Sequence, residues 1–233
     1  SRVNTLAKDV TENMDKFELG IAVQKVYDFI WDEFCDWYVE TAKYRIYHKE
    51  EEKAAADCVL WVLKTVLKQA LKLLHPFMPF ITEEIYSVLV PEEESLMMSE
   101  WPQFHAEWDF PAEENVMEHV KEITRGIRNM RAEMNVPNNR KTKVYVVCED
   151  TEICDGISTL ENSIKPLMMA EKILVQQTKE NIADNAVSVV VPDAVVYLPL
   201  EDLVDFEQEM ERLQKEEEKL KKEIKRAEGM LSN

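Results

Sequence analysis

The chain has 233 residues, of which 45% are hydrophobic and 32% charged, a composition that supports a folded core and is unlike that of disordered proteins. Its 46 acidic and 28 basic residues give a formal net charge of −18, which excludes a generic polyanion binder, whose charge would have the opposite sign. Only four glycines are present, and neither GxGxxG nor GxxxxGK[ST] occurs, so no phosphate-binding loop of either kind is predicted.

Apolar residues three and four positions apart predict five helices in the first 139 residues. The predicted helices are 3–17, 21–44, 53–75, one from near Thr82 to just before Pro91, and one from Pro111 to just before Asn135. Pro76 and Pro79 separate the third helix from the fourth, and the Thr82 side chain is expected to cap the fourth. Residues 91–111 are predicted to form a loop that Trp101 and Trp108 hold against the helices.

The periodicity changes after residue 139. Strands are predicted at 143–148, 173–175, 186–191 and 195–198, with a helix over 153–169. Together they indicate a small α+β module. The fold class is therefore mainly α, with a helical bundle at 1–139, the module at 140–200 and a C-terminal coiled-coil helix at 201–233.

The last segment has a heptad pattern, because apolar residues from Leu203 to Leu231 alternate spacings of three and four. A single coiled-coil helix cannot bury its apolar seam, so two partners are considered. Either two copies of the chain pair here, or the helix is the first half of an antiparallel hairpin whose second half lies beyond Asn233. The turn-forming residues Gly229, Ser232 and Asn233 favour the hairpin.

No catalytic or metal site is predicted. The four histidines are scattered, with no HExxH pattern, and no serine lies in a GxSxG motif. The four cysteines form no CxxC pair, so we interpret them as reduced thiols of a cytosolic protein, Cys35 and Cys58 on apolar helix faces. No apolar run reaches the ~18 residues that a membrane helix needs.

Clusters of basic residues are the most informative polar feature. Between Lys121 and Lys143 there are seven bases and two acids, and Lys64, Lys68 and Lys72 share one helix face. Further bases close the second helix beside tyrosines and crowd residues 219–226. Such clusters suit RNA phosphates and unpaired bases. Solvated helix faces, helix-dipole complementation and intrachain ion pairs are the alternative explanations for each cluster.

Four stretches of the chain resemble the anticodon-binding region of the valyl-tRNA synthetases. They are residues 16–20 (KFELG), 27–38 (YDFIWDEFCDWY), 74–84 (LHPFMPFITEE) and 127–137 (IRNMRAEMNVP), and Leu198-Pro199-Leu200 then leads into a heptad helix like the family's C-terminal arm. The 74–84 motif is shared with isoleucyl and leucyl relatives, whereas FCDWY and the terminal coiled coil point to the valyl enzymes. An isoleucyl relative would be expected to end in a zinc-holding cysteine cluster, which is absent here.

The resemblance implies that the parent enzyme is a cytoplasmic, monomeric valine–tRNA ligase that joins valine to tRNA(Val). ATP and Mg²⁺ would bind in an upstream catalytic domain, next to an upstream editing domain; the chain itself would hold no cofactor and no catalytic site. The first helix of the bundle is also expected upstream.

Nine residues are the candidate RNA contacts. Lys43, Tyr44 and Arg45 are assigned to the anticodon loop. Arg128 and Arg131 are assigned either to RNA or to buried hydrogen bonds that hold the bundle. Lys221, Lys222, Lys225 and Arg226 are assigned to the outer corner of the tRNA. The alternatives are the same region of an isoleucyl or leucyl relative, and a helical module that binds no RNA and pairs through its coiled coil.

Overall fold

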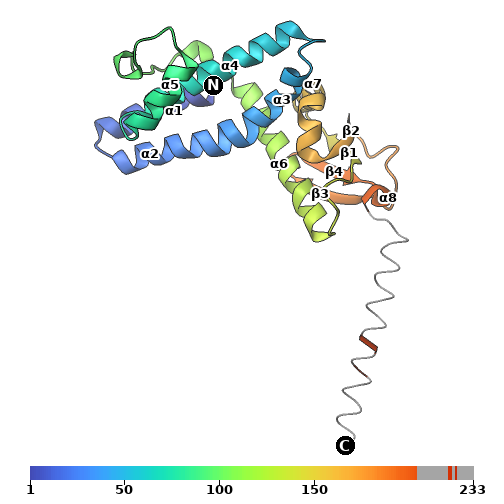
Figure 1. Cartoon of the computed structure of the whole chain (residues 1–233). Coiled ribbons are helices and arrows are strands. Elements are labelled where there is room, and N and C mark those ends of the chain that lie inside the picture. The colour runs from blue at the N-terminus through green and yellow to red at the C-terminus, as the bar shows by residue number, and fades with distance from the viewer. Residues whose placement is uncertain (204–219, 222–223, 225–233) are drawn as a thin grey trace, which may run out of the picture. The chain divides into compact units, whose positions relative to one another are not determined.

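The computed structural model describes residues 1–203, 220–221 and 224, so most of the predicted coiled coil lies outside the described residues. The contacts divide the chain into two compact units (Figure 1). The first comprises Ser1–Glu118 with Asn162–Leu167, and the second comprises His119–Glu161 with the residues from Met168 onward. The domain boundaries that the sequence predicts, at residues 139 and 200, stay predictions.

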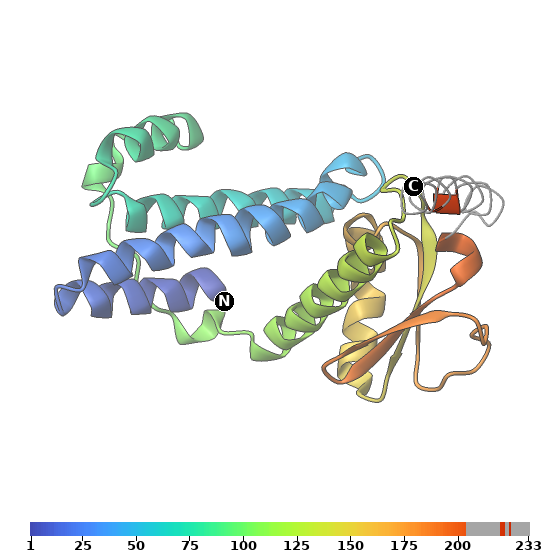
Figure 2. The same ribbon diagram turned by 90° about the horizontal axis from the view of Figure 1, so that it is seen from below.

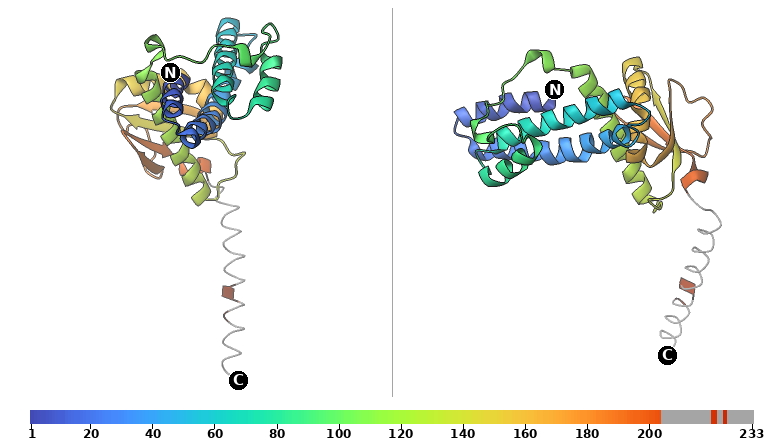
Figure 3. Two further views of the ribbon diagram at one scale, coloured as in Figure 1. Left: turned by 90° about the vertical axis from the view of Figure 1, so that its left-hand side faces the viewer. Right: turned by 45° about the horizontal axis from the view of Figure 1, so that its top comes forward.

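The first unit is helical throughout, as the periodicity predicts. Its elements are α1 (Arg2–Asp15), α2 (Leu19–Asp28), the π-helix η1 (Phe29–Val39), α3 (Glu40–Tyr47), α4 (Lys53–Leu74), α5 (Pro79–Leu89), the 3₁₀ turns η2 (Leu96–Met98) and η3 (Ala106–Trp108), and the start of α6 (Pro111–Glu133). In Figures 2 and 3, α1, the run from α2 to α3, and α4 lie side by side. Their shared core contains Val10, Val26, Phe29 and Leu73.

The helix predicted at 21–44 has a wide middle section. It runs continuously from Leu19 to Tyr47, but residues 29–39 are π-helical. Hydrogen bonds between residues five apart bring Phe29 and Phe34 onto the same face, where both are buried. The Phe34 ring also stacks on Tyr38, with 6.3 Å between the ring centroids. A search for α-helical spacing cannot detect this section, because its aromatic residues align at a different period.

The loop after α5 is held to the bundle by polar contacts and by one of the two tryptophans, rather than by both. Trp101 Nε1 donates to Thr11 Oγ1 at 2.8 Å, and the ring packs on the first unit's core, as predicted. The Asn4 side chain makes two hydrogen bonds of 2.8 Å to the backbone of His105. Its Nδ2 donates to the His105 carbonyl oxygen, and its Oδ1 accepts from the His105 amide. Trp108, by contrast, remains 44% exposed, and its ring contacts the His105 ring at an interplanar angle of 40°.

The predicted cap of the fourth helix is wrong. Helix α5 begins at Pro79, which suits the first helical position because the missing amide has no acceptor there. Thr82 is therefore inside the helix, fully buried, and its hydroxyl donates to the Met78 carbonyl at 2.8 Å. His75 Nδ1 lies 2.8 Å from Thr82 Oγ1. Because the Thr82 hydroxyl already donates its hydrogen to the Met78 carbonyl, His75 acts as the donor to Thr82.

The second unit is built on a four-stranded sheet. Its elements are residues 119–133 of α6, β1 (Thr142–Cys148), α7 (Thr151–Met168) except for residues 162–167, β2 (Ala170–Gln176), β3 (Val187–Val191), β4 (Ala194–Leu198) and α8 (Leu200–Leu203). The strand order is β2-β1-β4-β3, with β1 and β2 parallel across the α7 connection and the other neighbours antiparallel. This is the α+β module that the sequence predicts.

The described residues show no helix with the length and apolar character needed to cross a membrane. Within the same residues no group of three or more histidine, cysteine or acidic side chains could hold a metal ion. All four cysteines are free thiols. Cys35 is partly buried and Cys58 is exposed.

Helix α6 approaches β3 closely at Gly126. A Cβ atom at this position would lie 2.7 Å from Val189 Cγ1 and 3.3 Å from Val191 Cγ1. Valine has little rotameric freedom with which to move aside, so this contact requires glycine in the middle of a helix.

We therefore expect Gly126→Ala to lower the free energy of unfolding by about 1–2 kcal/mol, although alanine is the better helix former. The matched control is Gly20→Ala in α2, where an added Cβ meets nothing within 4 Å. That change should leave stability unchanged or raise it by up to about 1 kcal/mol. Urea denaturation followed by circular dichroism measures both, and a stabilising Gly126→Ala would contradict the close contact.

Candidate nucleic-acid interface

The end of α3 carries the predicted anticodon contacts. Lys43 Nζ donates to Glu40 Oε1 at 2.5 Å, and this hydrogen bond raises the pKa of Lys43. The Tyr44 ring stacks on His48 with 4.3 Å between centroids, and His48 Nδ1 lies 2.8 Å from the Tyr44 carbonyl oxygen. Arg45 is half-buried beside Tyr38. These three side chains lie at the same end of the helix, but Lys43 already binds Glu40 and Tyr44 already stacks on His48.

Two residues at this helix end are more accessible than the predicted ones. Tyr47, the last residue of α3, is 76% exposed, and Lys49 is exposed in the turn that follows. Glu50, Glu51 and Glu52 come directly after them and are also exposed. The positive surface is therefore narrow, and an exposed aromatic ring that can stack on an unpaired base is its strongest feature. The sequence feature that indicates a role for Tyr47 is its position among basic residues at the end of a helix.

The lysines on α4 form ion pairs instead of an open positive face. Lys64 Nζ lies 3.3 Å from Glu92 Oε1, and Lys68 pairs with Glu93, which also accepts from the Tyr86 hydroxyl. Lys72 Nζ donates to the Glu100 carbonyl at 3.1 Å, and burial lowers the pKa of Lys72. Lys64 and Lys68 thus follow the ion-pair explanation, whereas Lys72 is held by a backbone carbonyl.

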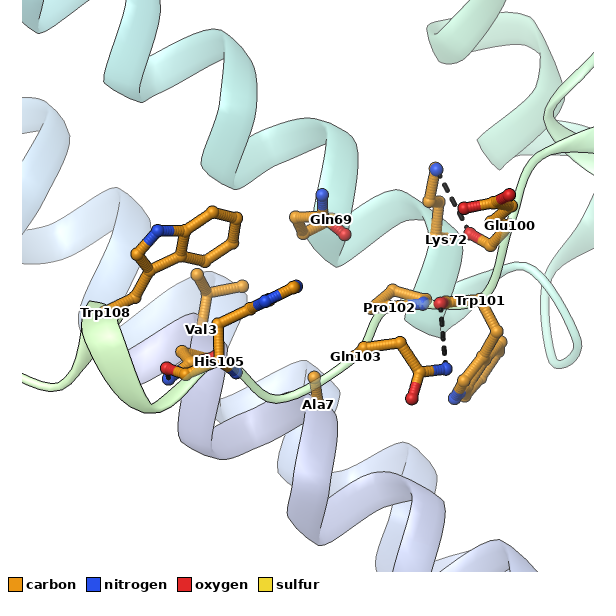
Figure 4. A pocket seen from close by; sticks show the side chains of 11 residues that line it. Val3, Ala7, Gln69, Lys72, Glu100, Trp101, Pro102, Gln103, His105 and Trp108 are labelled. Carbon is orange, nitrogen blue, oxygen red and sulfur yellow. Dashed lines mark hydrogen bonds between the residues drawn. The ribbon is translucent and has the colours of Figure 1, made fainter.

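Lys72 and the adjoining loop also line a cavity of about 200 Å³ (Figure 4). Val3 and Ala7 of α1, Gln69 of α4 and the His105 and Trp108 rings form its other walls. His105 Nδ1 lies 3.5 Å from Glu107 Oε1, and the His105 ring is tilted against the Trp108 ring, with 4.3 Å between the centroids. The cavity walls mix apolar and polar side chains, and part of them comes from the loop that Asn4 and Trp101 hold in place.

The two arginines of the 127–137 motif have different surroundings. Arg128 is exposed on α6, where an RNA could contact it. Arg131 is only 3% exposed, and its Nη2 donates to the carbonyls of Pro137 at 3.0 Å and Arg140 at 2.6 Å. Burial lowers the pKa of Arg131. Its position favours the second of its two predicted roles, in which it organises the turn after α6.

Arg140 continues this network to α8. Its Nε donates to the Asp202 carbonyl at 2.6 Å and its Nη2 to the Glu201 carbonyl at 3.2 Å. Asp202 Oδ2 accepts from the Lys143 amide at 3.2 Å, which ties the same residue to the start of β1. Two arginines therefore link the end of α6 to the point where the chain leaves the sheet for its C-terminal segment.

Of the four bases predicted for the outer corner of a tRNA, only Lys221 is among the described residues, where it is exposed. Lys222, Lys225 and Arg226 lie outside them. The neighbouring heptad positions Leu220 and Ile224 are 53% and 57% exposed.

A comparison with known proteins shows the family of the chain. Residues 1–146 match the family model described as the anticodon-binding domain of tRNA ligase. The chain belongs to this family.

Similar proteins extend the match to the whole chain. Over 233 residues it is 48% identical to the valine–tRNA ligase of Clostridium perfringens and 44% identical to that of Clostridium acetobutylicum. The valine–tRNA ligase of Bacillus subtilis is 36% identical over 236 aligned positions. Each alignment covers 100% of this chain and 26% of the relative, so the chain spans about a quarter of the length of these relatives.

Arg131→Met should lower the free energy of unfolding by about 2 kcal/mol, because methionine keeps the aliphatic stem but leaves two carbonyls without their charged donor. Arg128→Met is the control at the exposed position of the same helix, with an expected change below about 0.5 kcal/mol. Urea denaturation midpoints measure both. Equal, small effects at the two positions would return Arg131 to the list of RNA contacts.

The Glu93 cluster predicts a pH dependence of stability. The hydrogen bonds from Lys68 and Tyr86 lower the pKa of Glu93 from its ordinary value of 4.5. The folded state therefore favours the ionised form, so the stabilisation is complete above pH 4.5 and is lost as the pH falls through the lowered pKa. Because the pair is partly exposed, its contribution should stay below about 1 kcal/mol.

The test compares the chain with Glu93→Gln between pH 7 and pH 3 by urea denaturation. The difference in unfolding free energy should be present at pH 7 and disappear in acid. A difference that grows as the pH falls would contradict the assigned pairing.

Proposed function

We propose that this chain is the tRNA-binding region of a valine–tRNA ligase and that it recognises the anticodon arm of tRNA(Val). The observation that carries the proposal is the similarity of the whole chain to valine–tRNA ligases, at 36–48% identity, together with the family match over residues 1–146. Similarity that also covers residues 147–233 argues against the isoleucyl and leucyl alternatives. The proposal includes a cytoplasmic, monomeric parent enzyme.

The structure supports recognition through few contacts. In a chain of net charge −18, the α3 end offers Arg45, Tyr47 and Lys49, and α6 offers Arg128. Stacking on Tyr47 would hold an unpaired base, and the nearby bases would meet the adjoining phosphates. Lys221, Lys222, Lys225 and Arg226 remain the proposed contacts to the outer corner of the tRNA.

The chemical step belongs, in this proposal, to the part of the ligase that the chain does not span. ATP and Mg²⁺ would bind there, and valine would be activated and transferred there. Binding energy collected at the anticodon helps to position the acceptor end at the distant reacting centre. The chain itself should give no aminoacylation and no ATP exchange.

A module that binds no RNA is the competing proposal, and it has a distinct outcome. Such a module would form a concentration-dependent dimer through residues 203–231 and would show no salt-dependent binding of tRNA. Analytical ultracentrifugation with and without tRNA distinguishes the two proposals.

We expect the 233-residue chain to bind a tRNA(Val) transcript more tightly than a non-cognate transcript, with affinity that falls steeply with salt concentration. Tyr47→Ala should weaken binding about tenfold without changing the salt slope, since stacking releases no counterions. Arg45→Gln should also reduce the magnitude of the slope by roughly 0.7.

Lys64→Gln is the matched control, because Lys64 is paired with Glu92 at 3.3 Å. Filter binding or fluorescence anisotropy at several salt concentrations measures all variants. Equal affinity for the two transcripts would remove anticodon recognition from the proposal and leave only general electrostatic attraction.

A further inference from the structure

Two of the four cysteines are neighbours in the second unit. Cys148 is the last residue of β1, and Cys154 lies in the first turn of α7, just after the short connection between the two elements (Figure 1). The Cys154 thiol donates to the Cys148 carbonyl, with 3.3 Å between Sγ and the oxygen. The two thiol groups also form a hydrogen bond with each other. The fold therefore brings two sulfur atoms together at the point where β1 hands over to α7.

The connection between the two cysteines is held by its own hydrogen bonds. Asp150 Oδ1 accepts from the amides of Glu152 at 2.8 Å and Ile153 at 3.3 Å, and so caps the start of α7. The Asp150 carbonyl accepts from the Cys154 amide at 3.0 Å and from the Cys148 thiol at 3.5 Å. The two thiols therefore cannot separate unless the first turn of α7 unwinds.

The two thiols differ in their access to solvent. Cys148 is only 1% exposed, whereas Cys154 is partly buried. A small oxidant in solution therefore reaches Cys154 first and finds Cys148 behind it. Cysteines that respond to oxidation commonly have this arrangement, in which an accessible thiol lies next to a resolving one.

Cys154 is a slow nucleophile at neutral pH. Burial, the neighbouring Cys148 thiol and the carboxylates of Asp150 and Asp155 raise the pKa of Cys154 to about 11. Only the thiolate attacks a disulfide, so few molecules are reactive at any moment. The pair therefore stays reduced during brief oxidation and reacts only when an oxidant persists.

We propose that Cys148 and Cys154 form a reversible disulfide, with a low-molecular-weight disulfide such as oxidised glutathione as the oxidant, and that this bond holds β1 and α7 together covalently. In the first step, the Cys154 thiolate attacks one sulfur of the oxidant, forms a mixed disulfide and releases one small thiolate. In the second step, the Cys148 thiolate attacks Cys154 Sγ and releases the second small thiolate.

The balance of this exchange is complete. The protein loses two thiol hydrogens and two electrons, and the oxidant gains both as two free thiols. Excess thiol reverses the two steps, so the pair returns to the reduced state in a reducing compartment. The inference requires no contact with tRNA and is independent of the proposed function.

The other two cysteines provide a comparison within the same molecule. Cys35 and Cys58 belong to the first unit, and Cys58 is exposed. Burial and the nearby Asp36 carboxylate, rather than a second thiol, raise the pKa of Cys35. We therefore expect Cys58 to form a mixed disulfide with glutathione that no second thiol resolves.

Peptide mapping of the oxidised chain tests the proposal. The 233-residue chain is incubated with oxidised glutathione, blocked with N-ethylmaleimide and digested with trypsin without reductant. Residues 144–172 remain one tryptic peptide, because the only base between Lys143 and Lys172 is Lys165, which precedes Pro166. This peptide contains both cysteines of the pair and should lose two hydrogens without retaining glutathione. The peptide that contains Cys58 should retain one glutathione, which verifies that the oxidant was active.

Three results would overturn the proposal. The first is a glutathione that stays on the 144–172 peptide, and the second is an unmodified 144–172 peptide in a sample whose Cys58 has reacted. The third is a disulfide that links two copies of the chain, visible as a dimer on a non-reducing gel. None of these readings depends on a variant that must fold.

Two variants assign the roles of the two thiols. Cys148→Ala should convert the product into a lasting glutathione adduct at Cys154, because the resolving thiol is gone. Cys154→Ala should leave Cys148 unmodified, because that thiol is buried. The reverse pattern, with Cys148 carrying the adduct, would contradict the assigned order of attack.

The stability of the oxidised chain tests whether the bond fits the folded module. The disulfide restricts the unfolded chain, so the urea denaturation midpoint should be higher after oxidation than before it. Cys154→Ala treated in the same way should show no such rise. A lower midpoint in the oxidised chain would show that the connection between β1 and α7 does not accommodate the bond, and would overturn the proposal.

Discussion

An acidic chain can meet a phosphate backbone only where positive charge is both exposed and unneutralised. With 46 acidic residues against 28 basic ones, many lysines and arginines find a carboxylate of the same chain nearby. The ion pairs of Lys64 and Lys68 show the result on α4, where a row of bases contributes to holding a loop. The positive surface at the end of α3 is small, so the proposed recognition of RNA rests on a few contacts supported by stacking.

The fold was largely predictable because its helices and strands follow simple periods. The boundaries of α1, α4 and α6 lie within two residues of the expected ones, and all four strands are present. The errors have local physical causes. The π-helix η1 uses a five-residue repeat that an α-helical search does not test, and Pro79 starts α5 before the hydroxyl of Thr82 can act as a cap.

The candidate site was less predictable, since the residue type does not reveal the burial of a side chain. Arg128 and Arg131 are three residues apart in one motif, yet one is exposed and the other is buried against backbone carbonyls. Tyr47 and Lys49 were part of the tyrosine-rich, basic helix end, but only their exposure distinguishes them from Tyr44 and Lys43. Motif membership therefore selects a region of the chain but does not assign the roles of its residues.

The wide helix η1 precedes α3 in one uninterrupted run, so the direction in which α3 presents its side chains depends on how tightly the preceding residues are wound. Each residue of an α-helix advances about 100° around the axis. A change from π-helical to α-helical winding over residues 29–39 would therefore rotate Arg45 and Tyr47 to another direction around the helix axis. The winding of η1 thus sets the direction in which the exposed Tyr47 ring faces at the far end of the same helical run.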